Sequence, residues 1–352
     1  MKKLQVFDKI AFFRADDDCS LLLGGRGSYK KINEYFDDIY FLPQLQGYQV
    51  AGGQNGFVAF TNFENLKIFY ESKLVYDTNS MSYLANCNDT FLVENEVISC
   101  IVFFDVKKNN FGETTIKHWG KNYFSNDFLF VSQKEDIISY SLQNFHPLWQ
   151  YALPDGLYDG YNPHFKQVKK AEISKIIGVY DGVLWVALNT GWLLGLDVVN
   201  GTEQHTIRQP STFEQLRIFI SLYTQLDSEK GVLFGLRNTH YWEIDLEKEV
   251  LSYQIYDISS SFQQFKIRAE MPIYDWIWLG NEIFFGEIYD ADHRQDTNTV
   301  GIFDRTKREI IWADRIGKKG EIFPTVQKID YAEQRLYVLD GECTLHVFER
   351  EA

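Results

Sequence analysis

Paired cysteines, long apolar runs and an uncharged leader are all missing from this sequence. Its four cysteines, none in CxxC spacing, are Cys19, Cys87, Cys100 and Cys343. A secreted disulfide framework is denser than that, so we expect reduced, partly buried thiols. No apolar run approaches the ~18 residues that span a bilayer. Asp8, Lys9 and Arg14 interrupt the apolar stretch near the N-terminus, which a secretory signal does not allow. The sequence therefore predicts a cytoplasmic protein with no membrane contact.

Positive charge is scarce as well. Lys and Arg total 35 against 49 Asp and Glu, which gives a net charge of −14, and the densest basic group is Lys166, Lys169 and Lys170. Such a charge repels polyanions, so nucleic-acid binding is not expected and a basic protein partner is electrostatically favoured. An acidic surface also keeps proteins soluble without serving any partner, and this alternative stays open.

Aromatic residues, in contrast, are abundant, with 28 Phe, 21 Tyr and 8 Trp. That content excludes intrinsic disorder, which is typical of chains with few aromatics. Alternating apolar runs such as 128–131, 183–186 and 336–338 are broken by turn residues every eight to twelve positions. Helical periodicity is nearly absent, and only residues 30–40 are predicted to form a short helix. The pattern indicates an all-β sandwich, barrel or propeller.

A repeat distinguishes among these three architectures. In each copy a small polar or acidic residue ends one strand, and a large, mostly aromatic residue follows eight positions later. The pairs are Thr61 and Phe69, Ser141 and Trp149, Asp197 and His205, Asp245 and Tyr253, and Asp304 and Trp312, while Asp105 and Glu349 begin two further copies. The copies recur about every 48 residues, so seven of them account for most of the chain.

We interpret each copy as one four-stranded antiparallel blade of a seven-bladed β-propeller forming a single domain, 1–352. The acid is expected to accept backbone N–H bonds in the turn, and the aromatic side chain to pack between blades. The last copy ends after its third strand, so residues 1–13, through Leu4–Phe7 or Ile10–Phe13, are predicted to complete it and close the ring. Eight blades stay possible because residues 14–46 are hard to place.

One copy resembles a known family. Gly195-x-Asp197-x-x-Asn200-Gly201-x-x-x-His205 is similar to the Ala-x-Asp-x-x-Thr-Gly-x-x-x-Trp repeat of quinoprotein-like (PQQ-repeat) β-propellers, which are related in form to WD-repeat propellers. Asp304 to Trp312 keeps the acid and the Trp but has Arg308 in place of the Gly. The resemblance implies the propeller fold. It does not imply the quinone cofactor of some members, because the adjacent cysteines beside the quinone are missing.

Catalytic and metal-binding patterns are weak throughout. The seven histidines form no ligand spacing, and His205, in the aromatic position of the repeat, is expected to pack. Three aspartates within 290–296 suggest calcium, but the flanking His293 and Arg294 favour a solvated loop. Gly24-Gly25-Arg26-Gly27 lacks the Lys-Ser/Thr of a phosphate loop. We therefore predict no cofactor, no metal and no catalytic residue.

Loop length is the more informative feature. Residues 154–167, 259–270 and 290–298 form long connections, which are often functional, and in a propeller all three are expected on one face. The predicted partner-binding residues are Tyr158, Asp159, Tyr161, His164, Phe265, Arg268, Asp292 and Arg294. Tyrosine is favoured at binding hot spots; the alternative is that these rings lie flat and fill the top of the barrel.

The function predicted from these features is a non-enzymatic binding or scaffold protein that engages a protein partner through this face. Alternatives are a cytoplasmic toxin-neutralising protein, a hydrolase or lyase with carboxylates in the central pocket, and an oligomeric scaffold. The identity of the partner and the oligomeric state stay open.

Overall fold

The structure is a computed structural model of the chain. It describes residues 1–7, 10–15, 21–25, 28–32, 38–42, 49–52, 56–61, 65–70, 73–78, 81–87, 90–95, 100–105, 108, 110–116, 119–125, 127–162, 167–215, 220–237, 239–265, 273–287, 299–316, 326–332 and 334–351. The chain divides into two compact units. Unit 1 holds residues 1–62, 237–240 and 256–352, and unit 2 holds residues 63–236 and 241–255.

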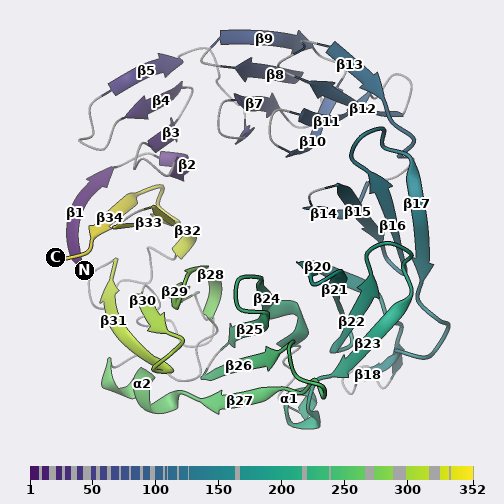
Figure 1. Ribbon diagram of the computed structural model, residues 1–352. Coiled ribbons are helices and arrows are strands. Elements are labelled where there is room, and N and C mark those ends of the chain that lie inside the picture. The colour runs from purple at the N-terminus through teal and green to yellow at the C-terminus, as the bar shows by residue number, and fades with distance from the viewer. Residues whose placement is uncertain are drawn as a thin grey trace. The chain divides into compact units, whose positions relative to one another are not determined.

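Four-stranded antiparallel sheets, built from consecutive strands, are the building blocks of both units (Figure 1). In unit 1 they are β2 (Ile10–Ala15), β3 (Leu21–Gly25), β4 (Ser28–Ile32) and β5 (Asp38–Leu42); β28 (Ile273–Leu279), β29 (Glu282–Glu287), β30 (Thr299–Asp304) and β31 (Glu309–Arg315); and β32 (Val326–Ala332), β33 (Arg335–Asp340), β34 (Leu345–Glu349) and β1 (Lys2–Phe7). A short helix, α2 (Ser259–Gln264), belongs to the same unit.

Unit 2 repeats the pattern. Its sheets are β10 (Met81–Cys87), β11 (Thr90–Asn95), β12 (Cys100–Asp105) and β13 (Asn110–Glu113); β14 (Lys121–Ser125), β15 (Phe128–Gln133), β16 (Asp136–Ser141) and β17 (Pro147–Ala152); β20 (Ile173–Tyr180), β21 (Val183–Leu188), β22 (Trp192–Asp197) and β23 (Glu203–Arg208); and β24 (Thr224–Asp227), β25 (Val232–Arg237), β26 (His240–Asp245) and β27 (Gln254–Asp257). A hairpin of β18 (Gly160–Asn162) and β19 (Gln167–Lys169), the helix α1 (Ser211–Gln215) and the 3₁₀ helix η1 (Ile220–Tyr223) complete it.

The remaining sheet has β6 (Gln49–Gly52) and β7 (Gly56–Thr61) in unit 1 and β8 (Asn65–Tyr70) and β9 (Lys73–Thr78) in unit 2. Among the described residues the strand pairing thus gives eight four-stranded sheets, so the count of seven is not confirmed and the alternative of eight fits. The sheet that the repeat missed is β2–β5. The helix predicted for residues 30–40 is wrong at both ends, because residues 30–32 lie in β4 and residues 38–40 in β5, while residues 33–37 lie outside the described residues. Thr61 ends a second strand rather than a third, so the repeat marked this sheet one strand early.

The predicted closure of the last sheet is confirmed. β1 pairs antiparallel with β34, from Lys2 opposite Glu349 to Phe7 opposite Leu345, and lies beside it in Figure 1. The closing strand is thus the first of the two candidate segments, while Ile10–Ala15 forms β2 and begins another sheet. The first strand of the chain completes the last sheet and covers the edge that β34 would otherwise expose. A single domain over 1–352 stays a prediction.

The polar residue that ends the third strand acts as predicted. Asp197 Oδ1 accepts the backbone N–H groups of Val199 at 2.9 Å and Asn200 at 3.0 Å. Asp304 Oδ1 accepts two amides of its own turn in the same way, at 2.8 and 3.0 Å. A carboxylate there satisfies donors that the turn leaves unpaired, which explains why the acid recurs.

The residue eight positions later packs between sheets as predicted at Trp149. Trp149 of β17 is 9% exposed, and its Nε1 donates to Val198 O of the next sheet at 2.7 Å. Its ring lies against Gly201, where a Cβ would come within 2.5 Å of it. His205, in contrast, is exposed and stacks on Trp185 of its own sheet, with ring centroids 5.6 Å apart. Trp149 therefore joins two adjacent sheets of unit 2 through the repeat position, whereas His205 does not.

Among the described residues no helix has the length and apolar character needed to cross a bilayer. Cys343 lies in the turn between β33 and β34 as a free thiol and is exposed, so for this cysteine the expected partial burial is wrong.

Candidate functional site

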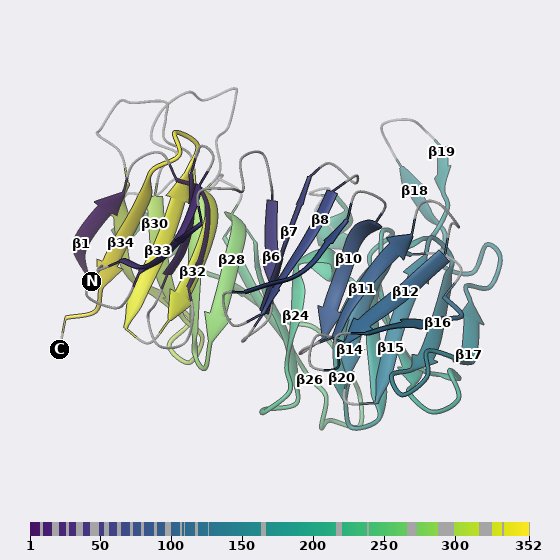
Figure 2. The same cartoon turned by 90° about the horizontal axis from the view of Figure 1, so that it is seen from above.

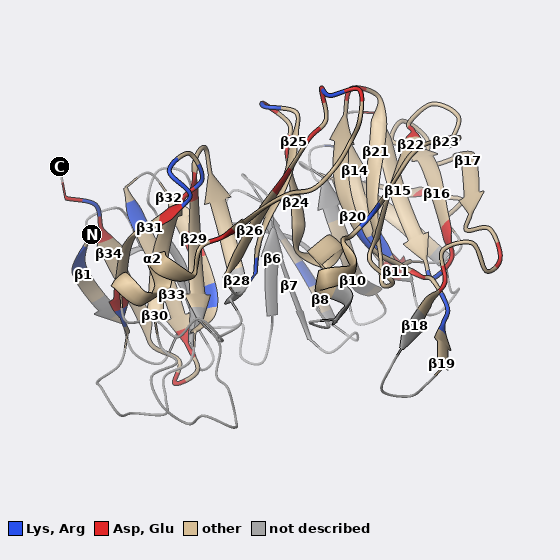
Figure 3. Cartoon of the chain, turned by 90° about the horizontal axis from the view of Figure 1, so that it is seen from below, with Lys and Arg blue, Asp and Glu red and all other residues tan. Residues whose placement is uncertain are grey.

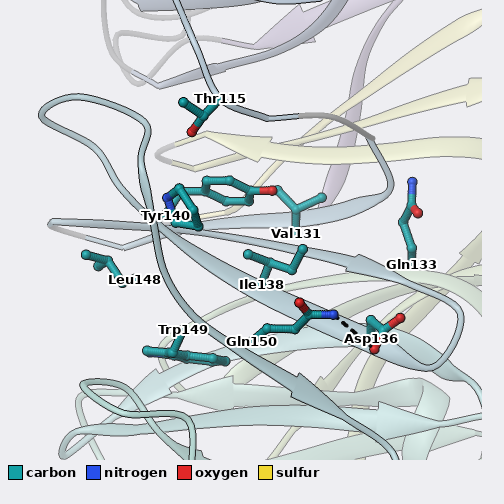
Figure 4. Close-up of a pocket in the computed structure, with 10 residues that line it drawn as sticks. Thr115, Val131, Gln133, Asp136, Ile138, Tyr140, Leu148, Trp149 and Gln150 are labelled. Atoms are coloured by element: carbon teal, nitrogen blue, oxygen red, sulfur yellow. Dashed lines mark hydrogen bonds between the residues drawn. The ribbon is translucent and has the colours of Figure 1, made fainter.

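A groove runs along the β14–β17 sheet of unit 2 (Figure 4). It has a volume of about 540 Å³, within the roughly 300–1,000 Å³ of ordinary ligand pockets. Its walls come from three consecutive strands and from the segment after β13. The lining residues are Thr115, Val131, Gln133, Asp136, Ile138, Tyr140, Pro147, Leu148, Trp149 and Gln150. All of these residues belong to unit 2, so the groove is a feature of one compact body.

The floor of the groove is apolar and fixed. Val131 and Tyr140 are each 4% exposed and belong to the core cluster shared with the preceding sheet. Thr115 Oγ1 donates to the backbone carbonyl of Phe145, which ties the segment after β13 to the β16–β17 turn and closes one wall. Burial raises the pKa of Tyr140, so its hydroxyl stays a neutral hydrogen-bonding group up to alkaline pH.

A β-bulge in β17 shapes the mouth of the groove. Ser139 pairs with Trp149, but Tyr140 pairs with Pro147, so Leu148 is the extra residue. A bulge redirects the side chain of its unpaired residue. Leu148 lies at the mouth of the groove with 50% of its surface exposed.

The opposite end of the groove is polar. Asp136 Oδ1 accepts a long hydrogen bond of 3.4 Å from Gln150 Nε2, drawn as the dashed line in Figure 4. A second, more open depression of about 770 Å³ adjoins it and shares Gln133 and Asp136. At its border Glu135 forms a salt bridge of 2.8 Å with Lys170.

The connection from β17 to β20, described over residues 153–162 and 167–172, borders this polar end. Leu153 N donates to Glu135 O at 2.9 Å. Tyr158 is only 3% exposed, and its hydroxyl and that of Tyr151 both donate to Glu203 Oε2 at 2.6 Å. Burial and this carboxylate raise the pKa of both tyrosines, so both remain donors at neutral pH. The connection is thereby attached to β23.

Two further hydrogen bonds hold the same connection. Asp159 Oδ1 accepts from Ala171 N at 2.8 Å, and Thr190 Oγ1 donates to Tyr158 O at 2.9 Å. Two aliphatic side chains of this connection are exposed, Leu157 (60% exposed) and Val168 (71% exposed). Val168 lies on the β18–β19 hairpin, which projects from the sheets of unit 2 (Figures 2 and 3).

The structure places the predicted site residues unevenly. Tyr158 corresponds to the packing alternative, since its ring is buried and lies edge-on to Trp192 at 5.4 Å. Asp159 holds its own loop, and Phe265 is half-buried after α2 in unit 1. The side chain of Tyr161, and His164, Arg268, Asp292 and Arg294, lie outside the described residues. Because the three loops belong to different units, the single shared face stays a prediction.

The groove residues Asp136 and Leu148 were missed by the sequence analysis. The sequence does contain an indication of Leu148, because this residue immediately precedes the repeat residue Trp149 and is the unpaired residue of the bulge. In two other sheets of the chain Gln204 and Ile311 are unpaired at the same place, just before His205 and Trp312.

Histidine also has a structural role where it is buried. His346 Nε2 lies 2.6 Å from Asp340 Oδ2, and the two side chains are 5% and 1% exposed. Asp340 Oδ1 in addition accepts the amides of Glu342 and Thr344, both at 2.9 Å. Within the described part of the chain, no three His, Cys, Asp or Glu side chains gather as metal ligands would.

No protein-family model and no curated protein matches this sequence. Solved structures match over the whole chain. The computationally designed Ika8 protein has a TM-score of 0.66 at 8% identity, over 99% of this chain and 98% of that one. BamB from Moraxella catarrhalis has a TM-score of 0.61 at 13% identity over 99% of both chains, and Sqt1 from Saccharomyces cerevisiae 0.65 at 10% over 100% of both.

BamB is a PQQ-like β-propeller and Sqt1 a WD40 protein. Together with the run of four-stranded antiparallel sheets, this likeness defines the class: the chain is a β-propeller. At such low identities the likeness shows the fold and leaves the particular family open. The predicted all-β propeller architecture is thus confirmed.

Proposed function

We propose that this β-propeller is a non-enzymatic binding module that engages a protein partner through unit 2. The observation that carries the proposal is the pair Leu157 and Val168, which are 60% and 71% exposed on a connection held by hydrogen bonds of Tyr158. Exposed apolar side chains on a fixed support bind at low entropic cost, because the support is already ordered. Isolated exposed apolar residues are common, but these two belong to one connection beside a groove.

The surface follows from this support. It consists of the described parts of the connection, residues 153–162 and 167–172, and the adjoining polar end of the groove around Glu135 and Asp136. It keeps one of the three loops that the sequence singled out. Structural neighbours of known fold, among them BamB and Sqt1, fit a scaffold or protein-binding role.

We also propose that the repeats are of the quinoprotein-like type. Support comes from the contact between Trp149 and the Asn200-Gly201 turn, where the Gly of the motif leaves room for the Trp ring of the preceding blade. Packing thus explains both the Trp and the Gly of the motif without a cofactor.

The test of partner binding is affinity capture from the native host, using the full chain and quantitative mass spectrometry. The test variant carries Leu157→Ser and Val168→Ser. The matched control carries Val250→Ser, which alters another exposed aliphatic residue (74% exposed) of unit 2. We expect at least one protein to be lost with the test variant and kept with the control, and to bind the purified chain in calorimetry.

Two results would overturn the proposal. One is a wild-type sample that enriches no protein above a tag-only control. The other is a test variant that is folded by circular dichroism and captures every wild-type partner to the same extent.

A further inference from the structure

The bulge position of the fourth strand has a structural use in two other sheets of this chain. In the β20–β23 sheet Gln204 is the unpaired residue, and its amide donates to Asp197 Oδ2 at 2.8 Å. In the β28–β31 sheet Ile311 packs against the core of unit 1. Leu148 does neither: it is 50% exposed at the mouth of the groove. The repeat itself therefore gives no reason for an exposed leucine there.

The groove behind Leu148 is built rather than incidental. Trp149 and Tyr140 hold its floor through buried contacts to the flanking sheets, so it keeps its shape without a ligand. Its volume of about 540 Å³ suits a few side chains, not a folded domain.

Charge determines what the groove accepts. Asp136 has no basic partner among the described residues, and its carboxylate accepts the long bond from Gln150. The neighbouring Glu135, in contrast, is paired with Lys170. A carboxylate with spare acceptor positions, beside an apolar channel, is complementary to a cation on an aliphatic stem. The net charge of −14 attracts basic segments in general.

We propose that this groove binds an extended peptide segment of a partner protein, with an aliphatic side chain against Leu148, Tyr140 and Trp149 and an adjacent Lys or Arg on Asp136. The inference rests on the proposed function and adds the chemistry of the partner. Because the groove and the pair Leu157 and Val168 carry separate substitutions, each claim can fail alone.

The experiment uses a phage-displayed library of random heptapeptides, selected on the full-length chain. We expect enriched peptides to place Lys or Arg next to Leu, Ile, Val or Met. One such peptide, made synthetically with blocked ends, is then titrated by fluorescence anisotropy. Asp136→Asn should weaken its binding by at least about tenfold, the ratio equivalent to 1.4 kcal/mol, and added salt should weaken binding to the wild type more than to this variant.

Matched controls separate the groove from general effects. Leu148→Gln, which installs the residue of the next sheet, should weaken the peptide by at least about tenfold. Val199→Gln and Asp181→Asn, on exposed turns of unit 2, should leave binding unchanged.

Each other outcome rejects the groove proposal. Selection of no consensus, selection of acidic peptides, or equal binding to Asp136→Asn and wild type would do so. Peptides lost only with Leu157→Ser and Val168→Ser would reject the groove while supporting the proposed function. Capture of no protein by any form would remove the proposed function itself.

Discussion

Replacement of Lys175 tests how the inner strands of unit 2 are joined. Lys175 lies on β20, and its Nζ donates to Thr224 O of β24 at 2.7 Å. Burial lowers its pKa from 10.5 to about 8, because the charged ammonium loses hydration that one carbonyl does not replace. The folded chain thus holds this proton less tightly than the unfolded chain does.

The sign and size of the effect follow from linkage. Since the unfolded chain binds more protons between about pH 8 and pH 10.5, the free energy of unfolding rises with pH across this window. With these two pKa values, the rise between about pH 7 and pH 9.5 is about 2 kcal/mol. Tyr151 and Tyr158 act in the opposite direction, because their pKa values are raised, but only above about pH 10, where an unfolded tyrosine ionises.

Urea unfolding at several pH values between these limits measures the effect. Lys175→Met removes the donor to Thr224 O, which should lower the free energy of unfolding by about 1–3 kcal/mol at every pH. The informative measurement is therefore how the free energy of unfolding changes with pH. We expect the variant to lose about 2 kcal/mol of the wild-type rise, and Lys134→Met, at an exposed lysine of the same unit, to keep it. Identical pH dependence in wild type and Lys175→Met would show that this lysine is not buried as described.

Two further predictions concern the joints of the fold. Gly201→Ala should destabilise the chain by about 2–4 kcal/mol in urea, because the residue has φ +73° and its Cβ would overlap Trp149. Gly182→Ala, with φ +74° and open space around the Cβ, should cost only about 1–2 kcal/mol; equal costs would mean that the Trp contact is not formed. Deleting residues 1–7 removes the five cross-strand pairs of β1 with β34 and should cost about 1–5 kcal/mol, with concentration-dependent association in light scattering; a monomer with unchanged melting would contradict the closure.

The repeat could be recognised in the sequence because its polar residues form hydrogen bonds within their own turns. An acid such as Asp197 satisfies amides two and three residues away, so spacing along the chain records the turn. The β2–β5 sheet escaped because Ile32, not an acid, ends its third strand. The eight-residue step from Ile32 still reaches Tyr40 in β5, so the period was present without its polar mark, and the count came one short.

The environment of Tyr158 was not readable, because it depends on distant residues. Glu203, 45 positions further along the chain, reaches the Tyr158 hydroxyl through the pairing of the next sheet. From sequence alone, a tyrosine in a long loop is as compatible with an exposed contact as with a buried anchor. Among the described side chains of this loop, the aliphatic Leu157 and Val168 are exposed, whereas the ring of Tyr158 is buried.

In a repeated fold, equivalent positions in different sheets can be compared to identify residues that serve structure. At the bulge of the fourth strand, Gln204 and Leu148 occupy the same backbone position in adjacent sheets. If Leu148 served packing, its replacement would cost the 2 kcal/mol or more that is typical of large core side chains. Because half of its surface is exposed, we expect Leu148→Gln to change the free energy of unfolding by no more than about 0.5 kcal/mol. A decrease of more than about 2 kcal/mol in the free energy of unfolding, measured in urea, would assign Leu148 to the core. It would also remove the exposed leucine on which the binding proposal for the groove depends.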